Sequence, residues 1–506
     1  MSFHSLLNSI IDSQSVTKNS LINETGIDRS SFYQILSGKR IPTKDQITSI
    51  IRQLDISAAD EMALYDAFYL ERLGETNYHY LKFTEKCLRV IGSPYIDTNA
   101  SNNQTPSRSQ ELQNKLPDNP IDTDQSQAAT GTILYHSTDE IICGLTKFLI
   151  HASKKENNHL QVSLPFDLSS RIKLFSNIHS LITSGKFQNA TISQILHFQT
   201  KNPDDITEKL DGFATLLESI LTKGTNITYN IYYYSNEQKV SKNSGVLFPF
   251  YIITDDASLL LNADANKGCL LTDPSLIGFM RKEFASVFDH AKPFLSSFSQ
   301  KELPQFQARS IPAEEVIFIQ KHPGACLMVT DDLVEKYVPE EFKETLKQHF
   351  HFMQQMNASE GITLDGIREF ARNHVIYESG FYVEADTPDI INALEQLKAR
   401  LDRNLFVLDT EKIPVSDNWA FLLYTDQYAL LVPNKELDFI ICVSDPDIIH
   451  ALTYTFHSVD FEDYVLDNTL VRNEIQPAYG SFNIMRGMPE GKADYCIKGP
   501  FETISR

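Results

Sequence analysis

The sequence predicts an all-α N-terminal domain followed by an α/β body with two related sheet-containing halves. Helical patterns extend to Val90, strand and helix patterns alternate after Gly131, and one segment of the body recurs later in the chain. With 506 residues the chain is too long for a single hydrophobic core. Its hydrophobic content of 42% and aromatic content of 10% are typical of globular proteins.

The stretch from Thr17 to Thr43, TKNSLINETGIDRSSFYQILSGKRIPT, predicts a helix-turn-helix. Gly26 stands where the first helix should end, because glycine tolerates the left-handed backbone conformation. Asp28 is a natural N-cap for a second helix from Arg29 to Ser37. The apolar contacts between the two helices are expected from Leu21, Ile27, Phe32 and Ile35.

The second of these helices has polar side chains at its early positions, where a recognition helix reads bases in a major groove. An alternative is a helical hairpin that makes only protein contacts. The candidate DNA-binding residues of the whole stretch are Lys18, Asn19, Arg29, Ser30, Ser31, Tyr33, Gln34, Lys39 and Arg40.

This stretch resembles the helix-turn-helix of the Xre/Cro-repressor-like family of bacterial and phage regulators. The resemblance covers Leu6 to Ile56, about a tenth of the chain, and LSGKRIPT from Leu36 to Thr43 is its most specific part. Family members often carry Gln where Lys18 stands and Ser where Asp28 stands. The resemblance implies site-specific binding of double-stranded DNA, with Lys18 at a phosphate.

Charge is distributed unevenly along the chain. The net charge is −21, whereas Met1 to Ser57 carries six basic and five acidic residues, or about +1. An acidic body repels DNA from every face except the one presented to it, which suits a site-specific reader with weak non-specific binding.

Further helices are expected over Phe3–Ile11, Thr43–Leu54 and Ala58–Val90, the last closing the domain or forming a dimer seam. Asp97 to Gly131 has six apolar residues and no aromatic one, so it is predicted to be a disordered linker. The expected domains are residues 1–96, the linker 97–131, a first α/β domain 132–300 and a second 301–506.

The first half of the body alternates helix and strand patterns, which predicts βαβ units in a mostly parallel sheet. The expected helices and strands, in order, are Ser137–Ala152, Leu160–Leu164, Asp167–Ser184, Thr191–Phe198, Asp205–Leu221 and Asn230–Ser235.

One segment of the body recurs. Tyr251 to Phe284 matches Leu422 to Phe456 at an offset of 171, which becomes 172 after one inserted residue. Each copy is predicted to form two strands joined by a polar turn, then a helix capped by Asp before Pro, at Asp273 and Asp445. Phe284 and Phe456, one helix-length downstream, are expected to be buried against their own sheets. The pattern favours two related halves, with chance similarity as the alternative.

The order of elements in the first half resembles the phospholipase-D-like fold, which serves as a ligand sensor in some bacterial regulators. The enzymes of that family need His and Lys two residues apart, followed by Asp. His197 and Lys201 are four apart and have no counterpart in the second copy, which argues against catalysis.

Other site signals are weak. His349 and His351 diverge on a helix, and the chain has no glycine-rich phosphate loop or G-x-S-x-G motif. The six cysteines lack C-x-x-C spacing and are expected to be buried thiols in a reducing cytosol. No membrane span or signal peptide is expected, and no metal or cofactor is predicted.

We therefore expect a cytoplasmic transcriptional regulator without enzymatic activity. Its expected partner is double-stranded DNA, bound by a homodimer across paired half-sites. The body is expected to sense a small-molecule or protein effector, to dimerise, or both. The alternatives are a nucleic-acid-targeted hydrolase of phospholipase-D-like ancestry, favoured by a polar cluster between the repeats, and a mobile-element repressor controlled by a protein partner, favoured by an exposed apolar patch.

Overall fold

The computed structural model describes residues 2–14, 16–93, 131–153, 159–165, 190–197, 206–221, 227–234, 248–299, 302–303, 306, 313–324, 328–378, 381–434, 439–475 and 496–497. The chain divides into two compact units, Met1–Phe83 and Thr84–Arg506. The boundary falls inside helix α6 (Glu75–Gly92), earlier than the expected boundary at residue 96. Apart from Gly131, the expected linker lies outside the described residues, as does the helix expected over Asp167–Ser184.

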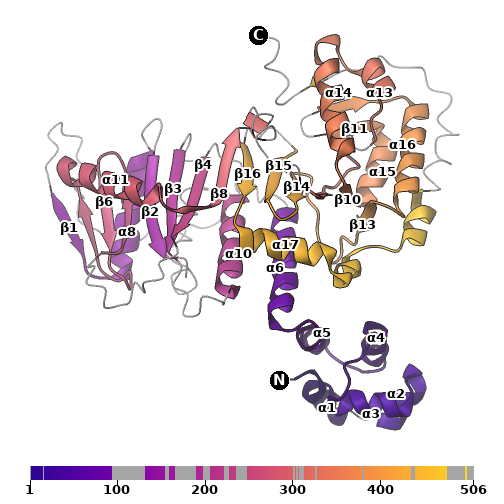
Figure 1. The fold of residues 1–506 in the computed structure, drawn as a ribbon. Coiled ribbons are helices and arrows are strands. Elements are labelled where there is room, and N and C mark those ends of the chain that lie inside the picture. Colours follow the sequence, from indigo (N-terminus) through magenta and orange to yellow (C-terminus); the bar gives the residue numbers. More distant parts are fainter. Residues whose placement is uncertain are drawn as a thin grey trace, which may run out of the picture. The chain divides into compact units, whose positions relative to one another are not determined.

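The first unit is helical, as predicted, and Figure 1 shows its short helices gathered around one another. Their apolar faces meet in a single core that includes Leu7, Leu21, Phe32, Ile47 and Phe68. The helices are α1 (Phe3–Ser13), α2 (Lys18–Thr25), α3 (Arg29–Leu36), α4 (Lys44–Arg52) and α5 (Ala58–Leu73).

The second unit is built on one sheet of 14 strands, seen as the row of arrows in Figure 1. In spatial order the strands are β1 (Thr132–Tyr135), β7 (Gly268–Leu271), β6 (Ser258–Leu261), β5 (Phe250–Ile253), β2 (His159–Pro165), β3 (Ala190–His197), β4 (Ile227–Tyr234), β8 (Lys292–Ser299), β16 (Phe439–Val443), β15 (Tyr428–Pro433), β14 (Trp419–Tyr424), β9 (Val316–Ile319), β10 (Ala358–Thr363) and β13 (Leu405–Leu408).

Smaller elements complete this unit. A second sheet has three strands, β11 (Val375–Glu378), β12 (Phe381–Glu384) and β17 (Cys496–Ile497). The remaining described helices include α8 (Thr138–Ser153), α10 (Thr207–Leu221), α11 (Pro274–Phe288), α13 (Asp331–Tyr337), α14 (Glu340–Gln355), α15 (Leu364–Asn373), α16 (Thr387–Arg400), α17 (Pro446–His457) and the 3₁₀ helix η7 (Val459–Tyr464).

The large sheet repeats one strand order. The run β7-β6-β5-β2-β3-β4 in the first half corresponds to β16-β15-β14-β9-β10-β13 in the second. In each run the last three strands are parallel and the others are antiparallel. The sheet is therefore mixed rather than mostly parallel, and each repeated segment has three strands before its helix rather than the expected two.

Strand β8 joins the two halves and reverses the second one. It is antiparallel to β4 on one side and to β16 on the other. Consequently β2, β3 and β4 run opposite to β9, β10 and β13, although the strand order is the same. The carboxyl ends of the parallel strands therefore lie at opposite edges of the sheet in the two halves.

The two halves also differ in which face of the sheet is covered by the helix that ends each repeated segment. In β5, Ile253 packs in a cluster with Phe284 of α11. Its counterpart in β14, Tyr424, belongs instead to the core that contains residues of α15 and α16. Phe421, three residues earlier in β14 and therefore on the other face of the sheet, stacks with Phe456 of α17, with ring centroids 6.2 Å apart. Helices α11 and α17 therefore cover opposite faces.

The helix starts in the two copies agree with the sequence prediction. Asp273 and Asp445 are N-caps that accept hydrogen bonds from the next backbone N–H groups, and a proline follows each. Phe284 is buried as expected. The repeat likewise predicts a buried phenylalanine at Phe456, the match of Phe284. That prediction was wrong, because Phe456 lies near the C-terminal end of α17 and is only partly covered there, by Phe461 among others.

The described cysteine side chains, at Cys87, Cys143, Cys269 and Cys442, are buried thiols that form no disulfide. Burial raises the pKa of each, that of Cys442 to about 12, so none is activated as a thiolate. Among the described helices, none combines the length and apolar character needed to cross a membrane.

A buried ion pair connects the two halves near β8. Lys209 of α10 places its Nζ 2.6 Å from Asp445 Oδ2 and 2.6 Å from Asp447 Oδ2 at the start of α17. The Asp445 side chain is fully buried, whereas that of Asp447 is exposed. The ammonium also lies 4.6 Å from the ring centroid of Tyr233. Lys209 therefore neutralises a carboxylate that has lost its contact with water.

Replacing Lys209 with Met should destabilise this unit by about 3–5 kcal/mol, because an uncompensated carboxylate would stay buried. Adding Asp445→Asn should recover much of the loss, since the amide oxygen can still cap α17. Denaturant unfolding followed by the emission of Trp419, the only tryptophan and a buried one, measures both effects.

The matched control is the exposed pair Lys86–Asp211, whose charged atoms are 3.9 Å apart. Lys86→Met should change stability by about 0–1 kcal/mol. Equal effects of Lys86→Met and Lys209→Met would contradict the role assigned to burial.

Candidate nucleic-acid interface

The turn between α2 and α3 is held by backbone conformation and by a cap. Gly26 has φ 69° and ψ 9°, the left-handed conformation predicted for it. A Cβ on Gly26 would have nothing within 4 Å, so the requirement for glycine here comes from the backbone angle and not from crowding. Asp28 Oδ1 accepts a hydrogen bond of 2.9 Å from the N–H of Ser31, and Ile27 is buried in the turn.

Helix α3 has one buried and one exposed face. Phe32, Ile35 and Leu36 face the core of the helical unit. The side chains on the other face are polar or aromatic and exposed: Arg29, Ser30, Tyr33 and Gln34. Residues four apart share a helix face, so the pairs 29 with 33 and 30 with 34 form one continuous surface. The Arg29 guanidinium carbon lies 5.9 Å from the centroid of the Tyr33 ring.

Ser31 does not face outward as expected. It is 8% exposed, and its Oγ accepts a hydrogen bond of 2.8 Å from Arg40 Nη1. The backbone N–H groups of Lys39 and Arg40 both donate to the carbonyl of Gln34. The segment after α3 therefore folds back beside it, and Ser31 positions the exposed Arg40 rather than belonging to the exposed face.

Polar side chains are also accessible at the start of α2. Lys18 is the first residue of the helix, partly exposed, with its Nζ 3.2 Å from Asp12 Oδ1. Asn19 is exposed beside it. Thr17 caps the helix by accepting from the N–H of Ser20. An exposed helix N-terminus with a nearby lysine is a favourable place for a phosphate.

The histidine sites considered in the body gain no support. The side chains of His197 and Lys201 lie outside the described residues. His351 is on α14, exposed, with its Nε2 2.9 Å from Asp331 Oδ1. The sequence also holds one His-x-Lys pair at a spacing of two, His290 just after α11 and Lys292 at the start of β8. Both are exposed, and no Asp occurs in the following 38 residues.

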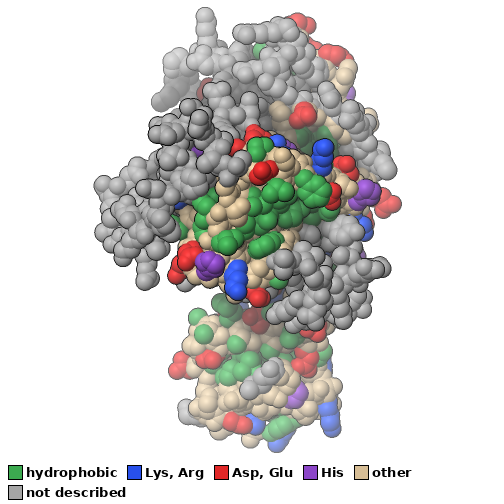
Figure 2. All heavy atoms as spheres, turned by 90° about the vertical axis from the view of Figure 1, so that its left-hand side faces the viewer, with side chains coloured by type: hydrophobic (Ala, Val, Ile, Leu, Met, Phe, Trp, Pro, Cys, Tyr) green, Lys and Arg blue, Asp and Glu red, His purple; other side chains and the backbone are tan. Residues whose placement is uncertain are grey.

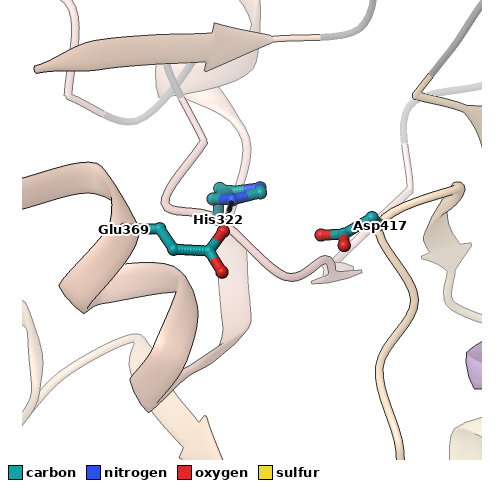
Figure 3. A group of neighbouring side chains, drawn as sticks. All are labelled: His322, Glu369 and Asp417. Atoms are coloured by element: carbon teal, nitrogen blue, oxygen red, sulfur yellow. Dashed lines mark hydrogen bonds and ion pairs between the residues drawn. The ribbon is translucent and has the colours of Figure 1, made fainter. Parts of the chain in front are cut away.

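A cluster that the sequence did not predict joins His322, Glu369 and Asp417 (Figure 3). They are separated by 47 and 48 residues, so no local spacing pattern marks them. Burial lowers the pKa of the adjacent Lys321, but hydrogen bonds to Glu369 and Asp417 outweigh it and the pKa is raised. Burial likewise raises the pKa of Glu369, but bonds to Lys321 and His322 outweigh it and the pKa is lowered.

No protein-family model matches the sequence, the Xre/Cro-repressor-like family included, and no curated protein matches it. Similar solved structures include TrmBL2, an archaeal chromatin protein described as having a novel mode of DNA binding, with 10% identity, 57% of this chain and 91% of that one covered, and a TM-score of 0.21.

Two other similar structures are enzymes. Phosphatidylserine synthase of Haemophilus influenzae Rd KW20 has 10% identity, covers 74% of this chain and 97% of that one, and has a TM-score of 0.21. Polyphosphate kinase of Porphyromonas gingivalis has 10% identity, with 87% of this chain and 65% of that one covered, and a TM-score of 0.22. These TM-scores are too low to support an inference about fold or function.

Replacing Asp28 with Ala should speed amide hydrogen exchange in the peptide covering α3, because the helix loses its N-cap. The hydrogen bonds from the Ser31 side chain and backbone lower the pKa of Asp28. The stabilisation is therefore present above the unfolded-state pKa of about 3.9 and is lost as the pH falls through the lowered, folded-state value. Asp28→Asn should keep the cap and lose this pH dependence.

The control is Asp45→Ala in α4, whose cap is Thr43. It should leave exchange in α3 unchanged. Unchanged exchange in Asp28→Ala at neutral pH would show that α3 does not depend on its cap.

Proposed function

We propose that this chain is a site-specific DNA-binding transcriptional regulator in which α2 and α3 form a helix-turn-helix and α3 enters the major groove. The main support is the exposed face of α3, where Arg29, Ser30, Tyr33 and Gln34 stand clear of the core. Arginine and glutamine are suited to base edges, because each can make paired hydrogen bonds to guanine and adenine respectively.

The surrounding cations suit the DNA backbone. Lys39 and Arg40 are exposed directly after α3, and Lys18 lies at the N-terminus of α2. Such contacts fix the position of a protein on the duplex without reading its sequence. Because Arg40 is held by Ser31, its position beside α3 is set before DNA binds.

We assign the body to effector binding and dimerisation, without enzymatic activity. An open groove of about 700 Å³, within the range of small-molecule sites, lies at the amino ends of β9, β10 and β13. Arg403, Phe456 and Phe461 are among its lining residues. A phospholipase-D-like hydrolase is disfavoured because the reversal places equivalent strand ends of the two halves at opposite edges of the sheet.

The end of the sheet at β1 is the surface we assign to a second copy. Leu134 of β1 and Leu276 and Phe279 of α11 are exposed by 58%, 49% and 60%. Figure 2 shows apolar side chains gathered on this end of the body. Among the described strands β1 is an edge strand, which can pair with its own copy about a two-fold axis. Such symmetry matches two half-sites in DNA.

Selection of bound sequences from a random duplex pool tests DNA reading. Arg29→Ala or Gln34→Ala should cost about 1–3 kcal/mol of specific binding and relax the preference at one position. Lys39→Ala should weaken binding to all DNA sequences alike and reduce the salt dependence of binding. If no sequence is enriched, or if Arg29→Ala leaves the enriched sequence and its affinity unchanged, the proposed recognition helix is wrong.

Phe279→Glu tests the dimer surface by placing a charge in the apolar patch. Light scattering should report a dimer for the unaltered chain and a monomer for the variant, and the variant should lose affinity for paired half-sites but not for a single one. The control is Val459→Glu, at an exposed apolar residue of η7. A monomeric unaltered chain, or a dimeric Phe279→Glu, would rule this surface out.

A further inference from the structure

The cluster around His322 is assembled by three elements that meet at one edge of the sheet. Lys321 and His322 lie two and three residues after the end of β9, and Asp417 precedes β14 by two residues. Because β9 and β14 are antiparallel neighbours, the end of one strand and the start of the other lie together. Glu369 comes from α15, which follows β10 on the other side of β9.

The backbone that carries His322 is held firmly. The carbonyl of Lys321 accepts hydrogen bonds from the N–H and Oγ1 of Thr363, at 3.2 and 3.1 Å. Gly366 packs so closely that a Cβ there would lie 1.8 Å from the same carbonyl oxygen. The N–H of Gly324 donates to the buried carboxylate of Glu360 at 2.6 Å. The loop after β9 is thus fixed on both sides of His322.

Lys321 orients the two carboxylates by contacting one oxygen of each. Its Nζ lies 2.8 Å from Glu369 Oε1 and 2.9 Å from Asp417 Oδ1. The other oxygen of Glu369, Oε2, is 2.9 Å from His322 Nε2. In Figure 3 the two carboxylates point toward one another beside the imidazole. In metal sites, a neighbouring residue commonly orients each ligand side chain by bonding to the atom of that side chain that does not contact the metal.

The distances suit one metal ion. One ligand atom from each of His322, Glu369 and Asp417 can be chosen so that all three lie within 4.8 Å of one another. Two ligands of a tetrahedral zinc ion lie about 3.3 Å apart, given bonds of about 2.0–2.1 Å, so small side-chain movements suffice. The ion would take the place of the hydrogen bond between His322 Nε2 and Glu369 Oε2.

Charge and ligand type indicate the class of ion. Two carboxylates and one ammonium leave one net negative charge beside the imidazole of His322. One nitrogen and two oxygen ligands suit a divalent transition metal such as zinc, whereas magnesium prefers oxygen ligands alone. The side chains are partly exposed, His322 by 18% and Asp417 by 45%, which leaves a path for the ion and room for a water ligand.

We propose that His322, Glu369 and Asp417 form a binding site for a divalent transition-metal ion, with Lys321 holding the two carboxylates in place. The competing explanation is an ion-pair network in which Lys321 alone balances the carboxylates. This inference concerns the second half of the body and stands independently of DNA binding.

Titration of the full-length, chelator-treated chain with Co²⁺ and Zn²⁺ tests the proposal. Co²⁺ should give a saturable visible absorption with one ion per chain, Zn²⁺ should displace it, and Mg²⁺ at the same concentration should not. Zn²⁺ should also raise the unfolding temperature reported by Trp419, which lies two residues after Asp417. Absence of a saturable Co²⁺ signal in the unaltered chain would overturn the proposal.

Variants assign the ligands. His322→Ala and Asp417→Asn should each weaken Zn²⁺ binding at least tenfold, and Asp417→Asn provides a mild, exposed change if His322→Ala fails to fold. The matched control is His457→Ala, which removes a histidine whose Nε2 lies 2.6 Å from a single carboxylate, that of Glu315, and should leave binding unchanged. Binding that persists undiminished in Asp417→Asn, or that is lost equally in His457→Ala, would place the metal elsewhere.

Discussion

The body depends on the pairing of β8 with a strand on each side. Because β8 is antiparallel to both β4 and β16, it joins two runs of strands into one sheet and turns the second run around. Strand pairing satisfies the backbone groups along each junction, so neither half leaves an open edge at the centre. The strand order therefore repeats, while strand direction and covered face are exchanged.

That reversal governs where chemistry can take place. In open α/β sheets, ligands gather at the carboxyl ends of parallel strands. In this protein those ends lie at opposite edges in the two halves, so the repeats cannot contribute equivalent side chains to one shared site. Each half has its own edge, and the His322 cluster lies at the edge that belongs to the second.

A charged side chain, the carboxylate of Asp445, is buried where the two halves meet. Asp273 and Asp445 have the same capping role, but Asp273 remains partly exposed while Asp445 is completely buried. Lys209, from the first half, compensates for that burial. The aspartate therefore caps a helix in both copies, whereas the buried ion pair with Lys209 forms at the aspartate of the second copy.

The sequence by itself determined what depends on neighbouring residues. Gly26 and Asp28 specified the turn and the start of α3, and Asp-Pro specified the starts of α11 and α17, because backbone angles and capping bonds reach only a few residues. Tertiary structure decided the mixed sheet, the reversal of its second half and the inward position of Ser31. It also brought His322, Glu369 and Asp417 together across 95 residues. Such contacts depend on which strand edges pair, and hydrophobic periodicity carries no information about that choice.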